Sequence, residues 1–244
     1  MATVSPGMTE KEISCRISKG WPPLSTDLPN PKTSTTGLSA MRLAHFLFIL
    51  IFSLCFFSSP ALASKTILVM GDSLSAGYGI RPELAWPALL DKRLNERGLD
   101  YNVANLSISG ETTAGGRSRL KSGLDQHKPA ILVLALGAND GLRGLPLKQM
   151  QENLNAMIDM AQKSGVKVLL AGIRLPPNYG PYASDFYNSF GDISRNKKTT
   201  LLPFLLDPVA TQGSYFQADN LHPTAEAQPL IMDHVWLTLR PLLK

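Results

Sequence analysis

The feature that most constrains the fold is a regular alternation, from Lys65 onward, of short apolar runs with longer stretches of helical periodicity. Five of the short runs are predicted to be strands, at residues 66–70, 102–105, 130–136, 166–173 and 201–206. Nearly continuous apolar runs of this kind are typical of strands that are buried on both faces. Their alternation with helices indicates right-handed crossovers into a parallel sheet. The predicted fold is therefore α/β, a three-layer α/β/α sandwich around a parallel five-stranded sheet.

Three helices can be placed between and after these strands. Apolar residues recur at helical spacing across 148–164, and Gly165 is positioned to end that helix. A similar pattern over 86–97 meets Gly98, and Pro223 is suited to be the first residue of a final helix that runs towards Arg240. No repeat or linker divides the chain after residue 63, so we expect a single domain at residues 64–244.

The segment before this domain resembles an export signal. Residues 43–57 form a 15-residue apolar run that follows Arg42 and precedes Ala61-Leu62-Ala63. The run is short for a bilayer-spanning helix, which needs about 20 residues, and two alanines at that spacing are typical of a signal peptide cleavage site. We predict a signal peptide at residues 41–63 that is cleaved after Ala63. The alternative is an uncleaved membrane anchor.

Composition excludes several other classes of protein. Residues 1–40 are polar and rich in Pro, Ser and Thr, so we expect a disordered extension, and Met41 is an alternative translation start to Met1. Both cysteines, Cys15 and Cys55, precede the predicted cleavage site, which disfavours a disulfide framework or a cysteine-based zinc site. The formal net charge is +5, and residues 64–244 account for +3 of it. These residues contain no long run of basic side chains, so no nucleic-acid partner is expected.

A serine closely follows the first predicted strand, within the sequence Gly71-Asp72-Ser73-Leu74. In parallel α/β sheets the chemistry gathers where strands end. A serine at the start of the next helix would present its hydroxyl beside backbone N–H groups, as an acyl-transfer nucleophile requires. The alternative for Ser73 is an ordinary helix N-cap.

The glycines of this region do not match the known phosphate-binding loops. Gly71 and Gly77 enclose five residues, whereas the glycines of a Walker loop enclose four. The segment Gly77-x-Gly79 lacks the third glycine of the dinucleotide-binding fingerprint.

Near the C-terminus, Asp219 and His222 have the spacing of a catalytic base and the acid that orients it. In a tight turn the carboxylate can accept a hydrogen bond from one ring nitrogen while the other nitrogen faces the serine. The remaining histidines fit this role less well, since His45 lies in the leader, His127 is predicted in a polar loop and His234 in the final helix. The alternative is a surface aspartate beside a histidine that caps the last helix.

Two further loop residues could stabilise an oxyanion, which needs donors that are in place before charge develops. Gly110 follows the second predicted strand and could bring its backbone N–H close to a substrate, and Asn139 follows the third and could donate from its side-chain amide. The alternatives are a turn for Gly110 and an Asx-turn for Asn139.

Residues 71–74, Gly110, 137–140 and 219–222 together resemble the four blocks of the SGNH, or GDSL, hydrolase family, in the family's order. Three further segments are similar to its branch of periplasmic thioesterases, lysophospholipases and arylesterases: 85–90 (AWPALL), 139–144 (NDGLRG) and 174–180 (RLPPNYG). The resemblance spans residues 66–244 and implies a flavodoxin-like fold. It also implies a catalytic triad in which Ser73 is the nucleophile, His222 is the base and Asp219 orients the base. The implied oxyanion hole consists of the backbone N–H groups of Ser73 and Gly110 and the side-chain amide of Asn139. The extension before Met41 departs from the family pattern.

The activity implied is that of an exported serine esterase, periplasmic or secreted, which acts through an acyl-enzyme without metal or cofactor. We expect a monomer with no membrane span after cleavage and a small ester or thioester substrate, including acyl or aryl esters and lysophospholipids. Residues 142–146 and 175–181 would wall a shallow apolar groove, unless their prolines only stiffen two surface loops.

Two other functions remain open. A carbohydrate deacetylase of the same family would need aromatic platforms at the rim, where Tyr78, Tyr179 and Tyr182 are candidates, while Trp86 is expected on the buried face of a helix. A non-catalytic acyl- or glycan-binding module could share the fold, but binding alone requires no nucleophile and base.

Overall fold

A computed structural model describes residues 64–243, and the predicted signal peptide, its cleavage site and both cysteines lie outside these described residues. Five parallel strands form one sheet in the order β2-β1-β3-β4-β5. Their bounds are β1 Lys65–Gly71, β2 Tyr101–Asn105, β3 Ile131–Ala135, β4 Lys167–Ala171 and β5 Thr200–Leu202. This order is that of flavodoxin-like sheets. The predicted parallel five-stranded α/β fold is confirmed.

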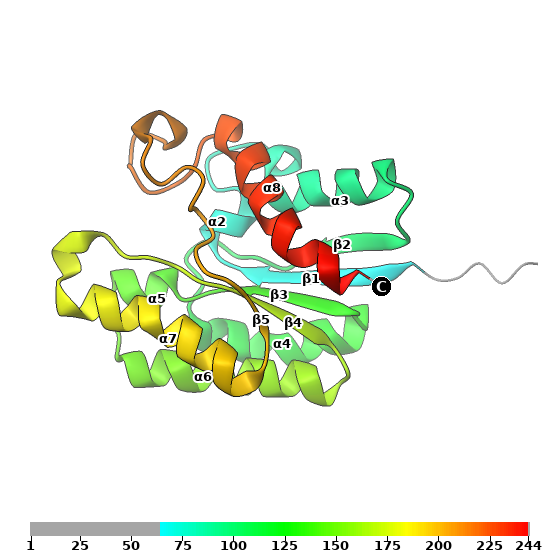
Figure 1. The fold of residues 1–244 in the computed structure, drawn as a ribbon, viewed down its shortest axis with the longest axis horizontal. Helices are drawn as coiled ribbons and strands as arrows, with labels where there is room; N and C mark the ends of the chain where they lie inside the picture. Colours follow the sequence, from blue (N-terminus) through cyan, green and yellow to red (C-terminus); the bar gives the residue numbers. More distant parts are fainter. Residues whose placement is uncertain (1–63, 244) are drawn as a thin grey trace, which may run out of the picture. The chain divides into compact units, whose positions relative to one another are not determined.

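Helices cover both faces of the sheet (Figure 1). The helices α3 and α8 pack together on one face, and α4, α6 and α7 pack side by side on the other. The helices span α2 Ser73–Ala76, α3 Trp86–Glu96, α4 Thr113–His127, α5 Ala138–Leu142, α6 Leu147–Lys163, α7 Pro181–Lys197 and α8 Gln228–Leu239. Short 3₁₀ turns lie at Pro82–Leu84, Pro177–Tyr179, Gly213–Tyr215, Ala225–Ala227 and Arg240–Leu242. Within residues 64–243 no helix is both long and apolar enough to cross a membrane.

The core lies between the sheet and its two helical layers. Every residue of β3 is buried, as are the last five residues of β1, which explains why both strands are almost continuously apolar. On α6 the buried side chains recur at helical spacing and include Leu154, Met157 and Ile158, and the helix ends before Gly165. The helices predicted at 86–97 and 148–164 are therefore confirmed.

Three local predictions are wrong. β5 ends at Leu202, because Pro203 follows it and has no N–H to donate to a neighbouring strand. Pro223 is not the first residue of the last helix; it pairs with Phe216 in an isolated antiparallel bridge, and α8 begins at Gln228 with Pro229 in its first turn. His127 lies in the last turn of α4 and not in a loop.

Candidate active site

Ser73 is the first residue of α2, immediately beyond the carboxyl end of β1. The N-cap of α2 is Asp72, whose Oδ1 accepts a hydrogen bond from the Leu74 N–H at 3.0 Å. The capping role proposed as an alternative for Ser73 therefore belongs to its neighbour. The Ser73 side chain is left half-buried on the wall of a cavity.

The imidazole of His222 joins Ser73 and Asp219 in one line of hydrogen bonds. Its Nε2 lies 2.9 Å from Ser73 Oγ, and its Nδ1 lies 2.6 Å from Asp219 Oδ2. The other carboxylate oxygen of Asp219 accepts from the backbone N–H groups of Leu221, at 2.9 Å, and of His222, at 3.0 Å. The structure thus brings together the three residues of the predicted triad, and His222 does not cap α8.

The carboxylate of Asp219 is held in its ionised form. The hydrogen bond from the His222 side chain, with smaller contributions from the two backbone N–H groups, lowers the pKa of Asp219 to about 2. An ionised carboxylate at Nδ1 keeps that nitrogen protonated, which leaves Nε2 free to accept the proton of Ser73. The arrangement can therefore generate a serine nucleophile.

Tyr78 packs against the base, a contact that the sequence did not reveal. The centroids of the Tyr78 and His222 rings lie 4.4 Å apart with an interplanar angle of 38°. Half of Tyr78 is exposed to solvent, so its ring covers the imidazole on the rim of the site.

Gly110 and Asn139 line the same cavity as Ser73 and His222. Gly110 has a φ of +80°, in the left-handed region that favours glycine, and its carbonyl accepts from Arg143 Nη2 at 3.1 Å. Asn139 belongs to α5, and its Nδ2 donates to the carbonyl of Glu111 at 3.0 Å. That bond engages one of the two amide protons, so the other remains able to serve an oxyanion. Neither Arg143 nor Glu111 was singled out from the sequence.

The site cavity has a volume of about 260 Å³. Its lining comprises Ser73, Leu74, Tyr78, Ser109, Gly110, Ala138, Asn139, Leu142, Leu221 and His222. A smaller cavity of about 50 Å³ shares Leu74, Ala138, Leu142 and Leu221 with it and continues towards Leu175 and Phe204. Of the two predicted walls, Leu142, Leu175 and Pro176 line these cavities, whereas residues 143–146 and 177–181 line neither of them.

A buried carboxyl lies directly behind the nucleophile. Asp72 is fully buried, and its Oδ2 has no hydrogen-bond partner among the described residues. Burial, with smaller contributions from Asp140 and Glu111, raises the pKa of Asp72 to about 7 against the opposing effect of the Leu74 N–H. This environment could not be predicted from the sequence, because it depends on elements that meet only in the fold.

Asp140 fixes the short helix α5, which carries Asn139. Its two carboxylate oxygens accept from the N–H of Thr113, at 2.8 Å, and from the Thr113 hydroxyl, at 2.6 Å. Thr113 begins α4, and its hydroxyl also accepts from Asn153 on α6 at 3.1 Å. This buried network ties α5 to two helices of the same layer and so holds Asn139 in place.

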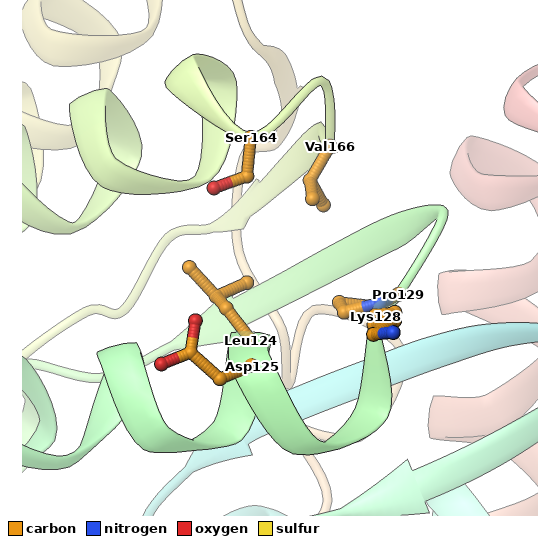
Figure 2. A pocket seen from close by; sticks show the side chains of 6 residues that line it. All are labelled: Leu124, Asp125, Lys128, Pro129, Ser164 and Val166. Carbon is orange, nitrogen blue, oxygen red and sulfur yellow. The ribbon is translucent and has the colours of Figure 1, made fainter.

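A larger cavity of about 590 Å³ lies at the opposite edge of the sheet, where strands begin (Figure 2). Its lining comes from the end of α4 and the turn before β4: Leu124, Asp125, Lys128, Pro129, Ser164 and Val166. The Ser164 hydroxyl donates to the carbonyl of Met160 at 3.2 Å within its own helix turn. No histidine lines this cavity, so it does not offer the chemistry of the first. Nor do three or more His, Cys, Asp or Glu residues gather as a metal site anywhere in residues 64–243.

Comparisons with known proteins agree with this geometry. Residues 69–229 match the GDSL-like Lipase/Acylhydrolase family. The chain is 50% identical over 182 residues to esterase TesA of Pseudomonas aeruginosa, covering 74% of this chain and 90% of that protein. It is 38% identical over 184 residues to thioesterase 1/protease 1/lysophospholipase L1 of Escherichia coli K12, covering 75% and 87%. The structure of the psychrotrophic esterase EstA from Pseudoalteromonas sp., inhibited by monoethylphosphonate, is similar with a TM-score of 0.71 and 41% identity, covering 73% of this chain and 98% of that one.

Proposed function

The chain belongs to the GDSL-like lipase and acylhydrolase family, and from that membership we propose that it is an exported serine esterase acting on carboxylic esters and thioesters. The observation that carries the proposal is the pair of contacts at His222, 2.9 Å to Ser73 Oγ and 2.6 Å to Asp219 Oδ2. A non-catalytic binding module would have no use for a serine hydroxyl aligned on an oriented imidazole.

In the proposed reaction, Ser73 Oγ attacks the carbonyl carbon of the substrate while His222 Nε2 takes the hydroxyl proton. The negative charge that develops on the carbonyl oxygen is stabilised by the N–H groups of Ser73 and Gly110 and by the amide of Asn139. Collapse of this intermediate breaks the bond to the leaving alcohol or thiol, to which the imidazolium returns the proton. Water then attacks the acyl-enzyme with His222 again as base, releasing the acid and restoring Ser73.

The groove favours an acyl chain or an aryl group over a sugar. The lining of the two cavities is mostly apolar, with Leu74, Leu142 and Leu221 common to both. Trp86 is fully buried and cannot form a sugar platform. The hydroxyls of Tyr179 and Tyr182 donate to backbone carbonyls, which fixes these rings as loop supports. These contacts support the esterase over the carbohydrate deacetylase.

One panel of substrates tests this proposal with the purified protein comprising residues 64–244. Nitrophenyl esters of rising chain length, an acyl-CoA, a lysophospholipid and an acetylated sugar would be compared by kcat/KM. We expect the acyl esters and the thioester to be hydrolysed and the acetylated sugar to be a poor substrate. Preference for the acetylated sugar would favour the deacetylase, and turnover of none of them would favour the binding module.

The N-terminal segments, the export and the oligomeric state of the protein are also matters of proposal. We propose that residues 1–40 are an extension, that 41–63 are removed during export to the periplasm or medium, and that the mature protein is a monomer with no membrane span. The apolar run at 43–57 followed by Ala61-Leu62-Ala63 supports the export step.

A further inference from the structure

The loop that carries the catalytic base is closed by Gln217. The backbone N–H of Gln217 donates to the carbonyl of His222 at 2.8 Å, and its own carbonyl accepts from the N–H of Asn220 at 2.9 Å. Asn220 adopts a φ of +54°, which lets the chain reverse between these two bonds. Asp219 and His222 therefore lie on a tight turn whose closing residue is Gln217.

The side chain of Gln217 reaches out of this turn to the segment that follows the nucleophile. Its Nε2 donates to the carbonyl of Tyr78 at 2.7 Å and to the carbonyl of Pro223 at 3.0 Å. The N–H of Tyr78 in turn donates to the carbonyl of Ser73 at 3.3 Å. The Gln217 amide thus links the backbone of Tyr78, which is hydrogen-bonded to Ser73, with the backbone of Pro223, which follows the catalytic base.

Gly79 provides the space that this amide occupies. A Cβ atom at Gly79 would lie 2.1 Å from Gln217 Oε1 and 2.9 Å from Gln217 Cδ, and the backbone there has a φ of +74°. Any other residue at position 79 would displace the amide and strain the turn. This contact with Gln217 explains why a glycine stands at position 79, in a segment that matches no phosphate-binding loop.

We propose that Gln217 is a positioning residue that fixes the separation of nucleophile and base. The inference rests on the proposed function, since it assigns to Gln217 a role in that same site. The two groups lie on different elements, a helix of four residues and a turn, and both side chains are only partly buried. One hydrogen bond between a hydroxyl and an imidazole contributes too little to hold two such segments in register. The Gln217 amide holds them through two backbone carbonyls, outside the reacting atoms.

The first test is Gln217→Ala, with Gln217→Met as a variant of similar length that cannot donate a hydrogen bond. A misplacement of about 1 Å between reacting groups can lower the rate on the order of 10²-fold. We expect kcat to fall by about 10-fold to 10²-fold in both variants, with KM changed less than about threefold because the groove is untouched. The rate at which a fluorophosphonate labels Ser73 should fall in parallel. A purely structural role would lower the melting temperature and leave kcat of the folded fraction unchanged.

The matched control is Gln212→Ala, an exposed glutamine of the same segment. It should keep the kcat and labelling rate of the unaltered protein. Values within twofold of the unaltered protein for both Gln217 variants would overturn the proposal. If Gln217→Ala does not fold, Gln217→Met decides alone.

Gly79→Ala probes the same contact from the other side. It should lower kcat in the otherwise unaltered protein, because the new methyl group displaces the amide and the left-handed backbone is strained. In the Gln217→Ala background only the backbone strain remains, so the additional loss should be smaller. Full additivity of the two losses would contradict the proposal. Failure of the proposed function would look different: the unaltered protein would then resist the fluorophosphonate altogether.

Discussion

Ser73 Oγ and His222 Nε2 lie 2.9 Å apart although 149 positions separate the two residues in the sequence. The sheet order explains how they meet. In a sheet ordered β2-β1-β3-β4-β5, the connections after β1 and after β3 leave in opposite directions, so a crevice opens at the carboxyl ends of these neighbouring strands. Ser73 follows β1 and Asn139 follows β3, and the turn carrying His222 covers the same edge.

The nucleophile is the first assignment to test. A fluorophosphonate should label the folded protein at Ser73, and Ser73→Ala should abolish both labelling and ester hydrolysis while the melting temperature stays within a few degrees. Peptide mapping of the labelled protein identifies the site. Ser164, whose hydroxyl lies in the cavity at the opposite edge, offers a control, since Ser164→Ala should react like the unaltered protein. Full activity of Ser73→Ala would end the serine esterase proposal.

The carboxylate of Asp219 should not limit activity at any pH near neutral. Since the pKa of Asp219 is lowered to about 2, its carboxylate stays ionised above about pH 3. Titration of Asp219 should therefore leave kcat/KM unchanged above about pH 3. Asp219→Asn removes the negative charge that holds the tautomer and should lower kcat by about 10⁴. A loss of less than tenfold, measured at pH 8, would show that Asp219 does not orient the base.

Much of this site could be predicted because its residues lie in local sequence patterns that can be recognised without the fold. Ser73 and Asn139 each follow a strand that is nearly all apolar, and such strands are recognisable without knowing their neighbours. Gly110 follows β2, which is partly exposed and contains two asparagines, so its strand is a weaker signal. Asp219 and His222 are close in sequence, so their contact needs only a tight turn. The sequence could not reveal contacts between distant segments, such as the packing of Tyr78 on His222 or the reach of Gln217 to the Tyr78 carbonyl.

The helix α4 shows a different limit of sequence analysis. It contains three glycines, which are poor helix formers, and shows no strong apolar stripe. In the fold these glycines allow close packing, since a Cβ at Gly116 would lie 2.3 Å from Leu136 Cδ1 and one at Gly123 would lie 2.8 Å from Leu106 Cδ1. Close packing against the sheet overrides the weak helical propensity, and that packing is visible only once the sheet is formed.

The buried carboxyl of Asp72 should make stability depend on pH. In the unfolded chain this carboxyl ionises near its ordinary pKa of 3.8, whereas burial raises its pKa to about 7 in the folded protein. The folded state therefore binds more protons between these values, and stability falls as pH rises from about 4 to 7. Asp72→Asn keeps an oxygen for the Leu74 N–H and carries no charge. It should be more stable than the unaltered protein at pH 8, by about 1–3 kcal/mol, and should lose that advantage at pH 4.

Thermal unfolding across this pH range measures the effect, with Asp207→Asn as the exposed control. A constant difference in melting temperature between Asp72→Asn and the unaltered protein from pH 4 to 8 would argue against a buried, protonated Asp72.

Export should leave a defined amino terminus. Cleavage after Ala63 would make Ser64 the first residue of the mature protein. Intact-mass analysis of the protein from the exported fraction checks this directly, and replacing Ala63 by a bulky residue should block processing. A mass that retains residues 43–57 would instead favour the membrane anchor.

Asn139 is the assignment for which a catalytic and a structural role make the clearest opposite predictions. If its amide donates to the oxyanion, Asn139→Ala should lower kcat by about 10²–10³, or roughly 2.7–4 kcal/mol of transition-state stabilisation. KM should change little, because the donor is aimed at charge that exists only in the transition state. The bond from Asn139 Nδ2 to the Glu111 carbonyl, at 3.0 Å, predicts an additional loss of folding stability on the order of 1 kcal/mol. Measuring kcat, KM and melting temperature of Asn139→Ala together separates the two contributions, with Asn188→Ala, an exposed asparagine of α7, as the control. A lower melting temperature with near-normal kcat would remove Asn139 from the oxyanion hole and leave it as a support of the loop after β2.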